Sequence, residues 1–276
     1  MIAPQVASIF IYPIKSLDGV AVSEATVLGS GALRGDRKFA IFDAQGNFVN
    51  GKRNAKVHLL RSRFNDDFTI LSLQIQGQKF DFYLDKERTA LEAWLSNYFG
   101  FPVKIEQNTL AGFPDDTNAS GPTIISTATL ETVASWFPGV SVEQMRLRMR
   151  ANIEIGGVPS FWEERLFTVA GNTVKFQIGE VIFEGINPCA RCIVPTRDAI
   201  TAEAYPKFQK TFVVKRKETL PSWVETSRFD HFFRLSVNTK VPALEAGKVL
   251  RQGDEVKVFE LQPSSANLTP NPSTSP

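Results

Sequence analysis

Hydrophobic and polar residues alternate along most of the first hundred residues of this chain, and alternation with a period of two is typical of β-strands. It predicts a first strand over 6–12 and a hairpin whose strands, 38–43 and 47–50, are joined by a turn that contains glycine. A second hairpin is predicted over 73–82, with its turn at 76–78. The N-terminal part is therefore expected to consist mainly of strands.

Three stretches show the helical period instead. Apolar residues recur at intervals of three and four over 91–99, and Gly100 ends this predicted helix. A second helix is predicted over 130–137. Ser141 and Gln144 have the spacing of a capping box, which predicts that a third, short helix begins there.

Strands are predicted again beyond these helices and complete the expected fold class. The predicted segments are 150–155, 167–170, 174–178 and 181–183. The pattern as a whole predicts a mainly β protein with some helix, an α+β fold, in two β-rich lobes. Residues 111–122 are rich in Gly, Pro, Asp and Ser, which is typical of a linker between lobes or of a loop at a functional site. The Pro- and Ser-rich end, 261–276, is expected to be disordered.

Composition and charge exclude several classes of protein. The 276 residues include 31 Lys and Arg against 29 Asp and Glu, and a net charge of +2 gives no broad basic surface for nucleic acid. No window of about 18 uncharged apolar residues exists, and the N-terminus lacks the basic region of a secretory signal, so we expect a cytoplasmic protein without a membrane anchor. Two cysteines are too few for a disulfide-rich scaffold, a four-thiolate iron–sulfur cluster or a zinc-finger array.

The two cysteines form the motif Cys189-Ala-Arg-Cys192, which is compatible with four kinds of chemistry. A thioredoxin-like redox pair is disfavoured because residues 193–195 predict an extended segment after the motif, whereas such a pair needs a helix. A zinc site would also need both histidines, which nothing in the sequence brings together. Two readings stay open: a pair of unreactive buried thiols, and one thiolate that ligates a redox metal and is kept deprotonated by Arg191.

Two further segments carry cations where they could meet an anion. Lys15 and Ser16 follow the first predicted strand in a turn, where a phosphate could bind, although these residues taken alone favour a solvated lysine and a turn serine. Arginines alternate with apolar residues over 146–150, so a strand here would present three guanidiniums on one face, either to solvent or to an anion. Asn152 continues that face with an amide group.

Taken in order, these segments resemble the MOSC family, named for the molybdenum cofactor sulfurase C-terminal domain. The resemblance is strongest to its two-domain members, which include amidoxime-reducing components and bacterial reductases. The segments that carry it are Tyr12-Pro-Ile-Lys-Ser16, Gly35-Asp-Arg37, Arg150-Ala-Asn152, Cys189-Ala-Arg-Cys192 and Gly253-Asp-Glu-Val256. It implies an N-terminal MOSC β-barrel-like domain over 1–110 and a MOSC β-barrel domain over 111–260.

The resemblance also implies a cofactor, a reaction and partners. The molybdenum cofactor (Mo-molybdopterin) would lie between the lobes, with Cys192 as the catalytic metal ligand and Cys189 in a structural role. The residues implied to bind the cofactor are Lys15, Ser16, Arg37, Ser120, Arg150 and Asn152. The implied reaction is the two-electron reduction of small N-hydroxylated compounds, with electrons from a separate protein of the ferredoxin, cytochrome b5 or flavoprotein type.

Some positions differ from the family pattern. Thr201-Ala202 stands where Thr-Gly is usual, Ala151 stands where proline is usual, and Glu163-Glu-Arg-Leu166 replaces Glu-Asp-x-Trp. These differences concern loop geometry and substrate preference more than the cofactor residues. Two alternatives to a reductase stay open: a cofactor carrier or sulfur-transfer module without turnover, and a non-catalytic binding module with two inert thiols.

Overall fold

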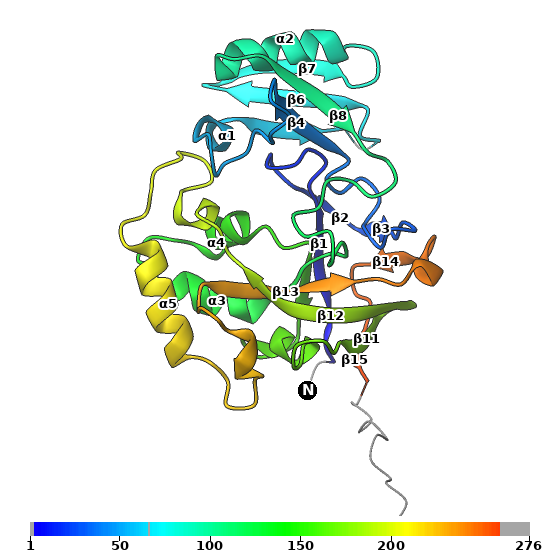
Figure 1. Cartoon of the computed structure of the whole chain (residues 1–276), viewed down its shortest axis with the longest axis vertical. Coiled ribbons are helices and arrows are strands. Elements are labelled where there is room, and N and C mark those ends of the chain that lie inside the picture. Colours follow the sequence, from blue (N-terminus) through cyan, green and yellow to red (C-terminus); the bar gives the residue numbers. More distant parts are fainter. Residues whose placement is uncertain (1–2, 66, 260–276) are drawn as a thin grey trace, which may run out of the picture.

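The computed structural model describes residues 3–65 and 67–259, and it stacks a smaller upper layer on a large lower sheet (Figure 1). The strands are β1 (Gln5–Ile11), β2 (Val20–Val22), β3 (Glu24–Thr26), β4 (Phe39–Asp43), β5 (Arg61–Phe64), β6 (Ile70–Ile75), β7 (Gln78–Tyr83), β8 (Val103–Gln107), β9 (Ile124–Ser126), β10 (Ile153–Gly156), β11 (Val174–Ile178), β12 (Val181–Ala190), β13 (Arg234–Lys240), β14 (Val249–Arg251) and β15 (Val256–Val258). The helices are α1 (Lys56–Leu59), α2 (Arg88–Phe99), α3 (Thr127–Ser135), α4 (Val142–Met149) and α5 (Phe208–Glu218).

The lower part is an eight-stranded sheet in the order β15-β11-β12-β13-β9-β10-β1-β2. Its neighbours are antiparallel except β9 and β10, which are parallel. Within the described ranges β15 and β2 stand at the ends of this strand order, and no closed barrel is assigned. A bridge between Gln5 and Glu255 and a hydrogen bond from the Val256 N–H to the Pro4 carbonyl (2.8 Å) nevertheless join the start of β1 to β15. The first strand of the chain thus belongs to the same sheet as strands of the second half.

The upper layer contains the antiparallel sheet β5-β6-β7, the pair β4-β8 and helix α2. Helix α2 buries Leu91, Leu95 and Phe99 against these strands, and Gly100 ends it with a φ of 85°. The turn between β6 and β7 has positive φ at residues 76 and 77, as a tight two-residue hairpin requires. The structure therefore confirms this predicted helix and the second predicted hairpin.

The lower helices lie against the large sheet. The Ser141 hydroxyl accepts a hydrogen bond from the Gln144 N–H (3.1 Å), and the Gln144 side chain accepts one from the Ser141 N–H (2.8 Å), which confirms the capping box that begins α4. Helix α5 was not predicted; it buries Phe208, Phe212 and Arg216, four residues apart along one face. The mainly β fold with some helix is confirmed. The domain limits 1–110 and 111–260 stay a prediction.

One predicted strand forms only in part and another is wrong. Residues 47–50 are not a regular strand, but they return along β4, which also pairs with β8. Phe42 and Phe48 form an antiparallel bridge, the Asp43 N–H donates to the Asn47 carbonyl (2.9 Å), and the Val49 N–H donates to the Ile41 carbonyl (2.8 Å). Residues 167–170 are not a strand, because β11 pairs with β12 and β15 and leaves them no partner. The predicted disordered tail, 261–276, lies outside the described residues. No helix in the two described ranges is long and apolar enough to cross a membrane.

Two further expectations near the candidate site are also wrong. Residues 146–149 belong to helix α4, so the alternating arginines do not share the face of a strand. Arg146 binds Glu154, Arg148 is 3 % exposed and donates to the Pro195 carbonyl, and only Arg150 reaches the ring of Tyr12. The segment after Cys192 is not extended but turns into a short 3-10 helix over Val194–Thr196.

Candidate functional site

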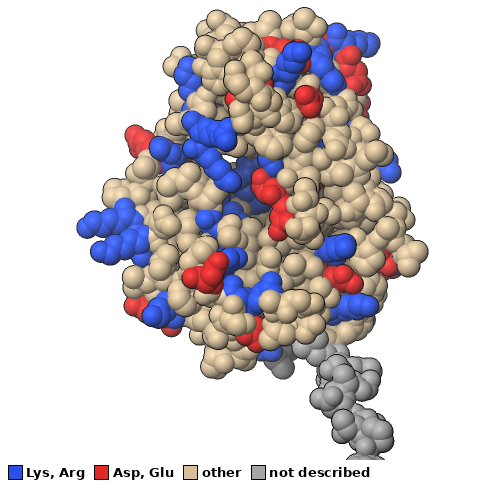
Figure 2. Space-filling model, viewed as in Figure 1, with Lys and Arg blue, Asp and Glu red and all other residues tan. Residues whose placement is uncertain are grey.

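A cleft of about 530 Å³ lies between the upper layer and the large sheet. All seven residues implied by the family resemblance line it: Lys15, Ser16, Arg37, Ser120, Arg150, Asn152 and Cys192. Residues of the stretch 111–122 also line it, so this stretch is a loop of the cleft. Lys and Arg side chains line a hollow in this face of the molecule, with Asp or Glu side chains along one edge (Figure 2). The fold therefore gathers segments that are far apart in the sequence around one space.

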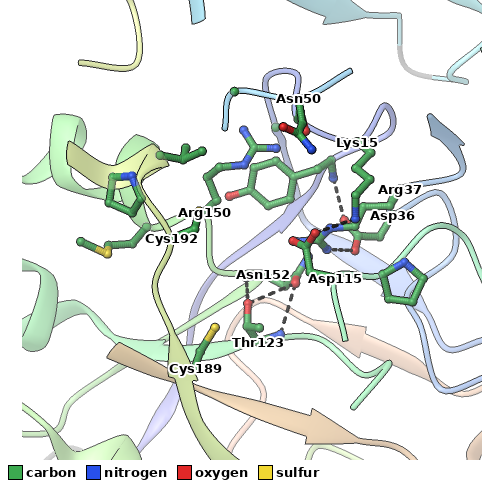
Figure 3. Close-up of a pocket in the computed structure, with 18 of the residues that line it drawn as sticks. Lys15, Asp36, Arg37, Asn50, Asp115, Thr123, Arg150, Asn152, Cys189 and Cys192 are labelled. Carbon is green, nitrogen blue, oxygen red and sulfur yellow. Dashed lines mark hydrogen bonds and ion pairs between the residues drawn. The ribbon is translucent and has the colours of Figure 1, made fainter. Parts of the chain in front are cut away.

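The turns after β1 and before β4 are joined by backbone hydrogen bonds. The Arg37 N–H donates to the Tyr12 carbonyl (2.7 Å), and the Lys15 N–H donates to the Phe39 carbonyl (2.8 Å). In return the Phe39 N–H donates to the carbonyl of Pro13 (2.9 Å). This pairing places Lys15 and Arg37 side by side on the wall of the cleft (Figure 3).

Three of the nine non-glycine residues with positive φ in the described ranges line the cleft. Ser16, Arg37 and Arg150 have φ angles of 73°, 47° and 52°, in the left-handed region that non-glycine residues rarely adopt. Each such residue costs about 1 kcal/mol or more, and strain of this kind clusters at functional sites. Arg150 ends α4 in this conformation, its N–H donating to the Arg146 carbonyl (2.9 Å), and the reversal of the chain directs its side chain into the cleft.

The ring of Tyr12 lies between two guanidinium groups. Its centroid is 4.2 Å from Arg150 Cζ and 5.5 Å from Arg37 Cζ, and its hydroxyl donates to the Ala151 carbonyl (3.1 Å). Burial raises the pKa of Tyr12 to about 12, although both arginines act to lower it, so the phenol is neutral at pH 7. Tyr12 therefore packs against both guanidiniums without neutralising their charge. The Arg150 side chain itself has no hydrogen bond or ion pair with any described residue.

Asp115 is the anion at which the cations of the cleft converge. The Lys15 ammonium donates to Asp115 Oδ1 (2.6 Å) and to the Phe113 carbonyl (2.9 Å) (Figure 3). Burial lowers the pKa of Lys15 more than Asp115 raises it. Burial acts to raise the pKa of Asp115, but Lys15, Arg37 and Arg150 together lower it to about 2. These three cations thus act on a single position in the cleft.

Two glycines hold the loop that carries Asp115. A Cβ atom on Gly112, whose φ is +63°, would lie 2.6 Å from the Asp36 carbonyl oxygen. A Cβ atom on Gly121 would lie 2.6 Å from Thr239 Oγ1. Only glycine allows such close approach, so both ends of the loop are fixed to the rest of the fold.

Asn152 and Ser120 line the cleft but bond to the protein. The Asn152 side chain is 1 % exposed; its oxygen accepts from the Thr123 N–H (3.2 Å), and its amide nitrogen donates to the Phe10 carbonyl (3.0 Å). The Ser120 hydroxyl donates to the Ser30 carbonyl (2.7 Å). Asn152 thereby links β1 to the segment before β9 at the back of the cleft. The predicted cofactor contacts of these two residues stay predictions.

The cysteines lie across the cleft from Lys15 and Asp115 (Figure 3). Cys189 is the last residue but one of strand β12, and Cys192 follows the strand. Both are free, partly buried thiols. Arg191 donates to Cys189 Sγ (3.3 Å) and to the Met149 carbonyl, whereas Cys192 Sγ has no hydrogen-bond partner among the described residues. Of the two sulfurs, that of Cys192 is therefore the one without a hydrogen-bond donor from the protein.

The cleft carries excess positive charge. Its lining contains eight Lys and Arg against four Asp: Lys15, Arg37, Lys52, Arg61, Arg148, Arg150, Arg191 and Arg197 against Asp18, Asp36, Asp115 and Asp116. Charges gathered on the walls of a cleft reinforce one another because the walls have a low dielectric constant. The arrangement suits a ligand with negative charge.

Sequence reasoning missed two residues of the cleft. The composition of 111–122 indicated a possible site loop, but nothing singled out Asp115 within it. His58 lies on α1, a helix of four residues that is too short to show a period. It lines the cleft, is 8 % exposed, and has its pKa lowered by burial.

Comparison with known proteins places the chain in a family. The model of the MOSC N-terminal beta barrel domain matches residues 3–93, and that of the MOSC domain matches residues 119–257. Mitochondrial amidoxime reducing component 2 of Bos taurus is 27 % identical over 264 residues, covering 78 % of this chain and 70 % of that protein. Among solved structures, the YUAD protein from Bacillus subtilis aligns over 95 % of this chain and 98 % of its own, with 13 % identity and a TM-score of 0.44. The chain belongs to the MOSC domain family, which is associated with the molybdenum cofactor.

Proposed function

We propose that the chain binds the molybdenum cofactor in the cleft and reduces small N-hydroxylated compounds. The observation that carries the binding is that Lys15, Arg37 and Arg150 line one cleft, with Lys15 bound to Asp115 and both arginines against the ring of Tyr12. The name of the bovine relative, an amidoxime reducing component, supports the class of reaction. Hydroxylamines and amidoximes are the substrates in this proposal.

The donors of the cleft fit such a cofactor. A pterin with a terminal phosphate and a metal needs cations, hydrogen-bond donors and one soft thiolate. Arg150 has a guanidinium without a carboxylate partner, and Lys15 and Arg37 lie beside it; we assign these three to the phosphate, with the Ser16 hydroxyl. Cys192 would supply the thiolate. When bound, the cofactor supplies the redox-active metal at which the N–O bond is cleaved.

The overall reaction fixes what the chain must provide. The N–O bond of the substrate breaks, two electrons and two protons are taken up, and an N–H product and one water form. Arg150 and Arg37, which pack against the ring of the neutral Tyr12, would hold the cofactor's phosphate. Arg191 holds Cys189 and the end of α4 together and so orients the loop that carries Cys192. The two electrons come from a separate protein.

The test compares the two cysteines. The wild type, Cys192→Ala and Cys189→Ala are expressed in a host that makes the cofactor, and molybdenum, pterin and the reduction of benzamidoxime by reduced methyl viologen are measured. We expect the wild type and Cys189→Ala to contain molybdenum and turn over, and Cys192→Ala to lose turnover. A wild type without molybdenum or pterin would refute cofactor binding. A wild type that contains both but reduces no N-hydroxylated compound would instead favour the carrier function.

A further inference from the structure

A second, shallow groove lies on the outer surface behind the cysteine loop. Ile193, Thr196 and the first turns of α5 line it, including the apolar Phe208 and Val214. Ile193 is 47 % exposed and Val214 is 48 % exposed, so water contacts both apolar side chains. We call this surface, with Lys207 and Lys210 at its edge, the outer groove.

The central cleft and the outer groove share the segment 192–196. Cys192 lines the cleft, and its neighbour in the chain, Ile193, lines the outer groove. Val194 and Pro195 line the cleft again, and Thr196 lines the groove. Consecutive Cα atoms are about 3.8 Å apart, so the backbone that carries Cys192 directly adjoins the backbone that lines the groove.

The outer groove is basic. Lys207 and Lys210 are in its lining, which contains no Asp or Glu, and neither lysine forms an ion pair with a described residue. Lys and Arg side chains project from the side of the molecule where α5 lies (Figures 1 and 2). An apolar patch edged by unpaired lysines complements a partner with an apolar centre and an acidic rim. Its small extent is typical of a transient contact.

We propose that the outer groove is the docking surface for an acidic electron-transfer protein. This inference rests on the proposed reductase function. The 276 residues contain two cysteines, too few for a four-thiolate iron–sulfur cluster, and in this proposal the electrons come from a separate carrier. Two carriers are each oxidised by one electron; these two electrons and two protons from water cleave the N–O bond and release one water. Docking at Ile193 brings the carrier to the segment that also carries Cys192.

Binding tests the surface without turnover. A plant-type [2Fe–2S] ferredoxin is the acidic probe, and its Kd is measured by calorimetry at 50 mM NaCl. The double variant Lys207→Glu/Lys210→Glu should bind it about tenfold more weakly, because two attractions become repulsions. Lys86→Glu/Lys104→Glu, which reverses two exposed lysines of the upper layer and changes the net charge by the same amount, is the matched control and should bind as the wild type does. Equal Kd values for the double variant and the control would overturn the proposal.

Turnover separates this inference from the proposed function. Reduction of benzamidoxime by reduced methyl viologen should be unchanged in the double variant, while reduction driven by ferredoxin should fall about tenfold at limiting ferredoxin. A loss of both activities would overturn the proposal, since the groove would then support the active site itself. A dimer of the wild type that the double variant abolishes would also overturn it, by assigning the groove to a second copy. Charge-dependent ferredoxin binding by a protein that reduces no substrate would support docking and refute the reductase function.

Discussion

Asp115 competes for the cations that we assign to the phosphate of the cofactor, so replacing it has opposite effects on folding and on binding. Asp115→Asn removes the negative charge that Lys15 contacts at 2.6 Å. It leaves Lys15, Arg37 and Arg150 facing the cleft without that counter-charge. We expect the variant, made in a host that cannot synthesise the cofactor, to be less stable than the wild type and to bind inorganic phosphate more tightly.

The size of the effect on stability follows from the pKa of Asp115. Lowering this pKa from 3.8 to about 2 corresponds to an upper bound of about 2.4 kcal/mol. The side chain is 74 % exposed to the solvent of the cleft, which screens the interaction, so we expect about 1 kcal/mol. Because folding lowers the pKa, this contribution is complete above pH 4 and is lost as the pH falls through about 2.

Urea unfolding at several pH values measures this contribution. The control is Asp116→Asn, which removes a charge from the same loop and keeps the oxygen that accepts from the Asn118 N–H. At pH 7 the free energy of unfolding should be about 1 kcal/mol lower for Asp115→Asn than for Asp116→Asn, and the difference should disappear near pH 2. Equal stability at pH 7, or weaker phosphate binding by Asp115→Asn, would refute the role of Asp115 as a competing anion.

Four further substitutions probe the site and the core. Arg150→Asn, whose new residue tolerates the left-handed backbone, should lower the molybdenum content of the purified protein while changing the free energy of unfolding by about 1 kcal/mol or less. Glu164→Gln should cost about 3 kcal/mol in urea unfolding, because it removes the partner of the buried Arg216. The neighbouring Glu163 should show the opposite effect, because burial raises its pKa from 4.5 to about 6 and the protein therefore loses stability as the pH rises through 6. Glu163→Gln should raise the free energy of unfolding by about 2 kcal/mol at pH 8 and leave it unchanged at pH 4. Gly185→Ala should lower the melting temperature and cost about 2 kcal/mol or more, since its Cβ would lie 1.6 Å from a backbone carbonyl oxygen.

Local patterns predicted the elements that local interactions determine. The helical period over 91–99 and the capping box at Ser141 are properties of neighbouring residues, and both appear as predicted. The partner of a strand is not a local property, so the sequence showed the turn that brings 47–49 back along β4 but gave no sign of β8, which also pairs with β4. The same limit hid the pairing of Gln5 with Gly156, which joins the beginning of the chain to its second half.

Most of the site was predictable because its residues lie in short local motifs. Lys15, Arg37 and Cys192 lie in short motifs whose order identifies the family, so each could be named before any contact was known. Periodicity alone led to a strand being predicted over 146–150, where the structure has the end of helix α4. Arginine at every second position would share one face of a strand, but on a helix the same arginines point in different directions. Asp115 carries no motif, and its importance comes from cations that reach it from three separate segments.

The charges that suit the cleft to the cofactor also oppose the folding of the chain without it. Burial and the nearby Arg37 both disfavour the protonated form of Lys15, and Asp115 only partly offsets this. A phosphate at the position where Lys15, Arg37 and Arg150 converge would relieve that repulsion, and its binding energy would add to the stability of the fold. The left-handed conformations of Ser16, Arg37 and Arg150 add a backbone cost in the same cleft. A fold that gathers cations and strain in one cleft is therefore expected to gain more stability from an anionic ligand there than from any single contact within the protein.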